Sequence, residues 1–283
     1  MPYRIFRSAS SVFVEDTESP GLFRHLDSGF AFNNLFSSDE PLAYLADQLK
    51  TASDADSFNP EIPFHPPIGD QEIWASGVTY FRSRTARMEE AETAGGDVFY
   101  DKVYDAERPE LFFKSSAHRA RGHLDKVGIR HDSTWDVPEP EFTLAISSSG
   151  KIFGYTIGND MSSRSIEGEN PLYLPQAKSY TGACAIGPCL VVGEIPALEN
   201  TISISIRRSD EEVFSGETAL NQIKRSFEEL AGFLFRCNDF AHGAYLMTGT
   251  GIVPDSDFTL QVDDEVAITI EGIGTLTNVV EKV

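Results

Sequence analysis

Residues 141–158 constrain the fold most, because their pattern is typical of a β-hairpin. Residues 141–146 alternate as a strand does, residues 147–150 have the composition of a turn, and the apolar run that follows returns as the partner strand. Glu139 and Glu141 stand at the entry to the hairpin, each directly after a proline. Proline favours an extended backbone around it. The two carboxylates are therefore expected to project from the same face of the strand.

Strand patterns also dominate the rest of the chain, which predicts an α+β fold: a mixed, mostly antiparallel β structure with helices at its edges. Further strands are expected at residues 72–80, 110–116, 201–206, 265–270 and 274–280, and helices at residues 42–49, 81–94 and 227–235. Residues 60–67 contain four prolines, which precludes regular structure and predicts a linker. We therefore expect a small N-terminal domain at residues 1–70 and a larger domain at residues 71–283.

Composition excludes several classes of function. The formal net charge is −21 and no basic patch is apparent, so nucleic acid is not an expected partner. No apolar run is long enough to span a membrane, and no signal segment is recognised at the N-terminus, which predicts a cytoplasmic protein. The acids are scattered along the chain. They fit either an ordinary solvated surface or adaptation to high salt, and the sequence leaves both open.

Three carboxylates and a pair of strands point to a metal site. Glu139 and Glu141 repel each other if held side by side, unless a proton or a cation intervenes. Asp160 follows one hairpin later and is expected to return alongside them. Three oxygen ligands without cysteine or histidine favour Mg²⁺, Mn²⁺ or Ca²⁺ over zinc. The alternative is that these are ordinary acids on a solvated strand face.

Three further features could bind an anionic substrate. Lys178 lies between a proline and an apolar run, so its stem could be buried and its amine could bind an oxyanion or move a proton. A surface lysine is the alternative. Arg82 belongs to an arginine cluster at the start of a predicted helix, where it either binds an anion or lies on a solvated face. Residues 248–251, Thr-Gly-Thr-Gly, form either a carboxylate-binding turn or a purely structural one.

Several of these motifs together resemble the fumarylacetoacetate hydrolase superfamily. The motifs are Glu139-x-Glu141, GNDMSSR at 158–164, QAKSYTG at 176–182 and TGT at 248–250. The resemblance spans residues 72–283. It implies a β-roll catalytic domain and a divalent metal on Glu139, Glu141 and Asp160. It also places Lys178 and Thr250 at the substrate, which in this family is a 2-oxo acid or a related enol or 1,3-dicarbonyl compound.

Other segments are similar to one branch of this family, the dehydratases of 2-keto-3-deoxy-D-arabinonate. These segments are residues 107–114, 127–130, 132–133, 135–141 and 169–176. The branch carries a small N-terminal domain. The C–C hydrolases of the family place a water-activating histidine near a position matched here by Ser83, and no histidine occurs between His65 and His118. Hydrolysis needs a base for the attacking water, so elimination is favoured, although decarboxylation stays open.

The resemblance implies a metal-dependent dehydration of 2-keto-3-deoxy-D-arabinonate to 2,5-dioxopentanoate, with Mg²⁺ expected first and Mn²⁺ or Ca²⁺ as alternatives. Lys178 and Glu110 are the candidates for proton transfer, and Arg82 and Thr250 for holding the substrate. A hydrolase, isomerase or decarboxylase of another 2-oxo acid is one alternative, and a sugar-acid-binding protein without turnover is another. The family also implies a homodimer or homotetramer.

Overall fold

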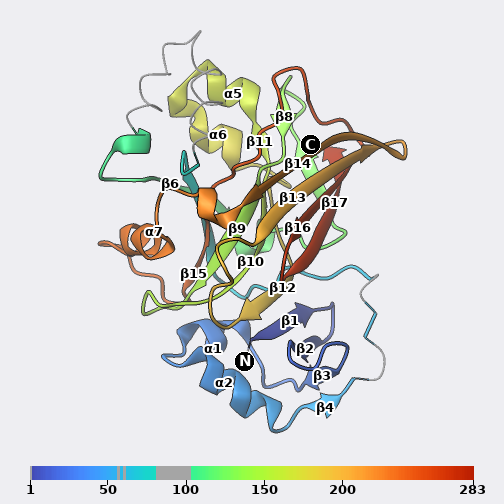
Figure 1. Cartoon of the computed structure of the whole chain (residues 1–283), viewed down its shortest axis with the longest axis vertical. Coiled ribbons are helices and arrows are strands. Elements are labelled where there is room, and N and C mark those ends of the chain that lie inside the picture. The colour runs from blue at the N-terminus through green and yellow to red at the C-terminus, as the bar shows by residue number, and fades with distance from the viewer. Residues whose placement is uncertain (1, 56–57, 60–61, 81–102) are drawn as a thin grey trace.

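The computed structural model describes residues 2–55, 58–59, 62–80 and 103–283 (Figure 1). The helix expected at residues 81–94 lies outside the described residues, and so does Arg82. Among the described residues, no helix is long and apolar enough to cross a membrane.

Two sheets make up most of the molecule. The larger has ten strands, in the order β4-β3-β2-β1-β12-β10-β9-β15-β5-β6, and the second has five, in the order β14-β13-β16-β17-β7. The strands of the larger sheet are β1 (Tyr3–Arg7), β2 (Val12–Asp16), β3 (Phe23–Leu26), β4 (Ser53–Asp54), β5 (Glu72–Gly77), β6 (Glu110–Ser116), β9 (Pro140–Ile146), β10 (Ile152–Asp160), β12 (Cys184–Val192) and β15 (Ala244–Met247). Those of the second are β7 (Lys126–Ile129), β13 (Thr201–Arg208), β14 (Glu211–Ala219), β16 (Glu265–Ile270) and β17 (Gly274–Lys282).

Short helices flank the sheets. They are α1 (Phe32–Ser37), α2 (Pro41–Leu49), α5 (Arg164–Glu169), α6 (Leu174–Lys178) and α7 (Phe227–Leu234), with 3₁₀ turns at Ala117–Arg119, Pro171–Tyr173 and Leu220–Gln222. A further small sheet pairs β8 (Asp136–Val137) with β11 (Ser162–Ser163). Figure 1 shows α1 and α2 beside β1–β4 at one end of the long axis, and α5 and α6 at the other end.

The strand pairing confirms the predicted mixed, mostly antiparallel fold. Within the named strands of the described chain, β15–β5 and β17–β7 pair in parallel and the other pairs are antiparallel. One hydrophobic core contains Phe142 and Ile157 of the larger sheet together with Ile204 and Ile268 of the second sheet. Because β9 and β10 are buried along almost their whole length, the hairpin lies at the centre of the protein.

The first strands continue the larger sheet rather than forming a separate one. Strand β1 pairs antiparallel with β12, with Ile5 opposite Leu190. On the other side, β1 pairs with β2. The division into domains at residues 1–70 and 71–283 stays a prediction.

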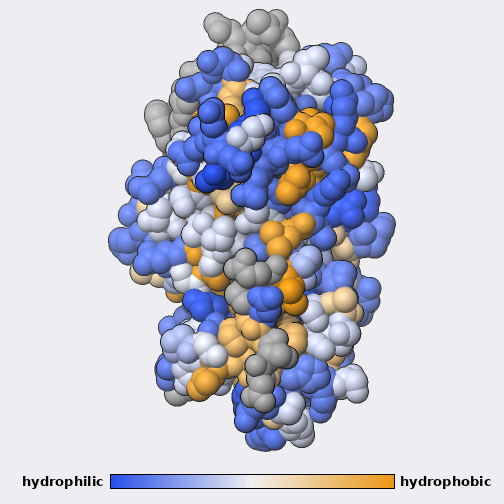
Figure 2. Space-filling model, turned by 90° about the vertical axis from the view of Figure 1, so that its right-hand side faces the viewer, coloured by the Kyte–Doolittle hydropathy of each residue, from blue (hydrophilic) through white to orange (hydrophobic). Residues whose placement is uncertain are grey.

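The surface is rich in hydrophilic residues on the face shown in Figure 2, with a few separate hydrophobic areas. Such a surface is what the scattered acids and the net charge of −21 predict. Both an ordinary solvated surface and adaptation to high salt fit this face.

Candidate metal centre

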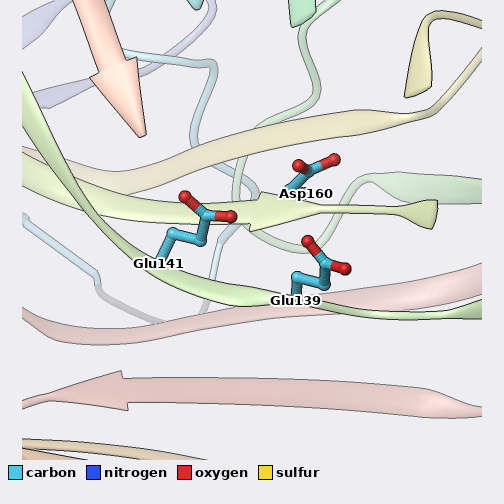
Figure 3. Close-up of side chains that lie close together, drawn as sticks. All are labelled: Glu139, Glu141 and Asp160. Carbon is cyan, nitrogen blue, oxygen red and sulfur yellow. The ribbon is translucent and has the colours of Figure 1, made fainter. Parts of the chain in front are cut away.

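The central hairpin brings the three predicted ligands together. Strand β9 pairs with β10 so that Glu141 lies opposite Gly158. One step further, Glu139 and Asp160 exchange backbone hydrogen bonds of 3.2 and 3.0 Å. Glu139, Glu141 and Asp160 each offer a carboxylate oxygen within 4.8 Å of the others (Figure 3). Their side chains are buried, with exposed fractions of 4%, 1% and 0%, so the alternative of a solvated strand face is wrong.

Each carboxylate is held by a second group. Arg164 Nη2 donates to Glu139 Oε1 at 2.6 Å, and Lys114 Nζ lies 2.5 Å from Asp160 Oδ1. The backbone N–H of Gly249, in the Thr-Gly-Thr-Gly turn, donates to Glu141 Oε2 at 2.5 Å. Such contacts fix the orientation of a carboxylate before any ion binds.

Lys178 completes the polar cluster from the last residue of α6. Its ammonium group donates to Glu139 Oε2 at 2.8 Å, to Asp160 Oδ2 at 3.0 Å and to Ser162 Oγ at 2.5 Å. The residue has no exposed surface, so the alternative of a surface lysine is wrong. An unpaired buried ammonium is costly, and these acceptors offset that cost.

The electrostatics of the cluster are unbalanced at Glu141. Among the described residues, ion pairs join Glu139 and Asp160 to cations, whereas Glu141 has no ion pair. Burial raises the pKa of Glu141 well above its usual range, and the charges of Asp160 and Glu139 raise this pKa further. A divalent cation would relieve this strain, and three carboxylate oxygens suit a hard ion. The residues therefore fit the predicted metal.

A narrow cavity adjoins two of the three carboxylates, those of Glu139 and Glu141. It is lined by Ser76, Gly77, Val78, Phe112, Glu139, Glu141, Arg164, Lys178, Gly249 and Thr250. Thr250 thus lies where a substrate-binding residue was expected, with its hydroxyl bonded to the backbone of Ile252. Glu110 pairs with Gly77, and a Cβ atom at Gly77 would lie 2.0 Å from Glu110 Oε2. The carboxylate of Glu110 therefore packs against Gly77, and Glu110 itself lines a different cavity, with Arg108 and Leu172.

Lys114, Arg164 and Ser162 were not expected at the site from the sequence. Arg164 ends the motif at residues 158–164, and Lys114 ends the similar segment at residues 107–114. The motifs thus contained both cations, but no local spacing indicates which acid each one contacts. Lys114 lies in β6 and contacts Asp160, which is 46 residues further along the sequence.

Asp136 gives the region a pH-dependent stability. Burial raises the pKa of Asp136 to about 6, and its contacts with Ser133 and Arg130 only partly oppose this. Between about pH 4 and pH 6, Asp136 is therefore protonated in the native state and ionised in the unfolded chain. The free energy of unfolding falls as pH rises through that range. We expect Asp136→Asn to stabilise the protein by about 2 kcal/mol at pH 7.5 and by little at pH 4.5. Urea unfolding at the two pH values measures the difference.

Asp132 is a matched control, because its pKa is shifted in the opposite direction. Asp132 is exposed, and its hydrogen bond to Arg130 lowers the pKa of its carboxyl group. Asp132→Asn should therefore give no gain at pH 7.5. An equal gain from both variants would contradict the argument from burial.

Comparison with known proteins identifies the family. The model of the family described as "Fumarylacetoacetate (FAA) hydrolase C-terminal" matches residues 89–281. A probable 2-keto-3-deoxyxylonate dehydratase of Haloferax volcanii is 49% identical over 77% of this chain and 74% of its own. The 2-dehydro-3-deoxy-D-arabinonate dehydratase of Saccharolobus solfataricus is 43% identical over 78% of this chain and 76% of its own.

Two solved structures are similar to this chain over its whole length. A hexagonal crystal form of 2-keto-3-deoxyarabinonate dehydratase has a TM-score of 0.85 and 34% identity, covering 100% of this chain and 99% of that one. A 2-keto-3-deoxy-D-arabinonate dehydratase complexed with magnesium and 2,5-dioxopentanoate has a TM-score of 0.82 and 33% identity, with the same coverage. The motif order, the fold and the sequence match lead to one conclusion: this chain belongs to the fumarylacetoacetate hydrolase family.

Proposed function

We propose that this chain is a metal-dependent dehydratase that converts 2-keto-3-deoxy-D-arabinonate to 2,5-dioxopentanoate. The observation that carries the proposal is the buried cluster of three carboxylates with Lys178 in contact with two of them. A full-length structural neighbour is named for the same reaction and was solved with magnesium and this product, which supports Mg²⁺ as the ion.

Glu139, Glu141 and Asp160 are the residues that would hold the ion. When bound, Mg²⁺ would supply a Lewis acid for the carboxylate and keto oxygen of a 2-oxo acid, which makes the C3 proton easier to remove. The buried wall around the carboxylates keeps bulk water away from these charges. The protein's own side chains must then remove the C3 proton and protonate the C4 hydroxyl group as it leaves.

Lys178 and Glu110 are proposed for these proton transfers. Lys178 Nζ lies 2.5 Å from Ser162 Oγ and 5.5 Å from the centre of the Phe112 ring, at the wall of the cavity. The carboxylate of Glu110 packs against Gly77, which lines the same cavity. Thr250 is proposed to hold a hydroxyl or carboxylate of the substrate. For Arg82, which lies outside the described residues, the same role rests on the sequence alone.

A chelation experiment tests the proposal. We expect protein treated with excess EDTA and then dialysed to lose its dehydratase activity, and added Mg²⁺ to restore it. Formation of 2,5-dioxopentanoate from 2-keto-3-deoxy-D-arabinonate is the measurement. Release of CO₂ would instead indicate a decarboxylase. Thermal stabilisation by the sugar acid without any product would indicate a binding protein.

We further propose a homodimer or homotetramer, which the family resemblance implies, a cytoplasmic location, and residues 1–70 as a small N-terminal domain, which the proline-rich stretch predicts and the resemblance supports. The mass in solution, measured by light scattering, tests the oligomer. No nucleic-acid partner is proposed, because the net charge of −21 opposes phosphate binding.

A further inference from the structure

Each of the three carboxylates has one oxygen in contact with a group other than Lys178. These oxygens are Glu139 Oε1 with Arg164, Asp160 Oδ1 with Lys114, and Glu141 Oε2 with the N–H of Gly249. On Glu139 and Asp160, the second oxygen is the one that contacts Lys178. The ammonium group of Lys178 therefore binds the same two carboxylates that are proposed to ligate the ion.

Lys114 and Lys178 differ in what they contact. Lys114 Nζ contacts Asp160, the carbonyl of Met161 at 2.9 Å and the carbonyl of Lys178 at 2.5 Å. Two of the three donors of this ammonium group therefore go to backbone carbonyls, and its contact with Asp160 is an ion pair. Lys178 Nζ, by contrast, donates hydrogen bonds to two carboxylates and to the hydroxyl of Ser162. The head group of Lys114 is thus held by backbone carbonyls, whereas the three acceptors named for Lys178 Nζ are side-chain atoms.

An ion and the Lys178 ammonium group would compete for these oxygens. Mg²⁺ lies about 2.1 Å from its oxygen ligands, so an ion on the same two oxygens could be no more than about 5 Å from Nζ. Two cations at this separation in a buried site repel each other strongly. Lys178 and Phe112 both line the cavity, and the face of the Phe112 ring, whose centre is 5.5 Å from Nζ, can attract a cation.

We propose that Lys178 holds the place of the metal ion in the metal-free protein and leaves Glu139 and Asp160 when the ion binds. The inference rests on the proposed function and deepens it. In the metal-free state, the ammonium group neutralises two carboxylates that would otherwise repel each other. In the metal-bound state, the same group turns to the cavity and becomes available to the substrate. Ion binding would thereby deliver the amine to the reaction site, so that the ion must bind before the substrate can be turned over.

Calorimetry tests the competition. We expect Lys178→Met to bind Mg²⁺ at least about tenfold more tightly than the wild-type chain, because a competing cation has been removed. Lys151→Met is the matched control: Lys151 is an exposed lysine paired with Glu40, and its loss changes the net charge equally. Its Mg²⁺ affinity should equal that of the wild type. Unchanged or weaker binding to Lys178→Met would overturn the inference.

Crystal structures with and without Mg²⁺ test the movement itself. Nζ of Lys178 should lie beyond hydrogen-bonding distance of Asp160 Oδ2 in the Mg²⁺-bound wild-type protein. If Nζ keeps its contacts with both carboxylates, the inference is wrong. If the wild-type chain binds no Mg²⁺ at all, the proposed metal-dependent function falls with it, whereas tight binding with an unmoved Lys178 overturns the inference alone.

Folding of the variant is informative as well. If Lys178→Met is unfolded in EDTA but folds when Mg²⁺ is added, as judged by circular dichroism, the ion has replaced the ammonium group and the inference is supported. If neither Lys178→Met nor Lys178→Gln folds at saturating Mg²⁺, an ion cannot take over from the lysine, and the inference is overturned.

Discussion

Replacing Glu141 by glutamine is expected to lower kcat/KM for 2-keto-3-deoxy-D-arabinonate by at least about a thousandfold, which corresponds to about 4 kcal/mol. The amide oxygen of glutamine can still accept the Gly249 N–H, so the local structure should persist. The variant loses the negative charge that is proposed to bind the ion. Steady-state kinetics over a range of Mg²⁺ concentrations, together with calorimetry of Mg²⁺ binding, measure both effects.

A second buried glutamate provides the control. Glu15 is 5% exposed and pairs with Arg4 at 3.0 Å, in the strands that precede residue 70. Glu15→Gln removes a buried carboxylate away from the cluster and should leave kcat/KM within about twofold of the wild type. Activity close to wild type in Glu141→Gln would show that the metal site has been assigned wrongly.

Lys178→Met is expected to lower kcat by about 10²–10⁴-fold, the range over which a general acid or base contributes. Its buried amine lies at the wall of the cavity, and no other lysine lines it among the described residues. The exchange of the substrate's C3 protons with D₂O, followed by NMR, separates its two possible roles. If Lys178 removes the C3 proton, exchange and dehydration are lost together. If it protonates the leaving hydroxyl group, exchange persists and dehydration alone is lost.

Glu110→Gln should give the complementary result. Its carboxylate packs against Gly77, which lines the cavity together with Lys178, so it is the partner candidate for whichever transfer Lys178 does not perform. The same exchange experiment without protein sets the background. Lys178→Met protein that retains both exchange and dehydration within a few-fold of the wild type would rule out a catalytic role for this amine.

Local sequence patterns predicted the hairpin and the ligand cluster well. The prolines beside Glu139 and Glu141 and the turn at residues 147–150 fix the strand register over a short span of chain, so Asp160 returns to the expected place. Burial then excluded a solvated strand face, which spacing alone could not do. The local sequence pattern does not show how deeply each side chain is buried, because burial depends on the segments that pack over the hairpin.

Local sequence patterns could not predict the contacts between residues far apart in the sequence. The pairs Lys114–Asp160 and Arg164–Glu139 join separate elements, and nothing in the local pattern of either lysine or arginine indicates its partner. The pairing of β1 with β12 is equally non-local. A proline-rich stretch predicts that regular structure ends there, but it says nothing of where the strands before it are paired.

The pairing of β1 with β12 gives the first seventy residues a protective role. Strand β12 is buried along its whole length and lies between β1 and β10, the strand that ends at Asp160. Without β1, the apolar β12 would become an open sheet edge, a surface that recruits other chains and leads to aggregation. The early strands therefore cover β12, which is the strand next to the carboxylate-bearing hairpin. Their removal is expected to lower the solubility of the protein more than its catalytic activity.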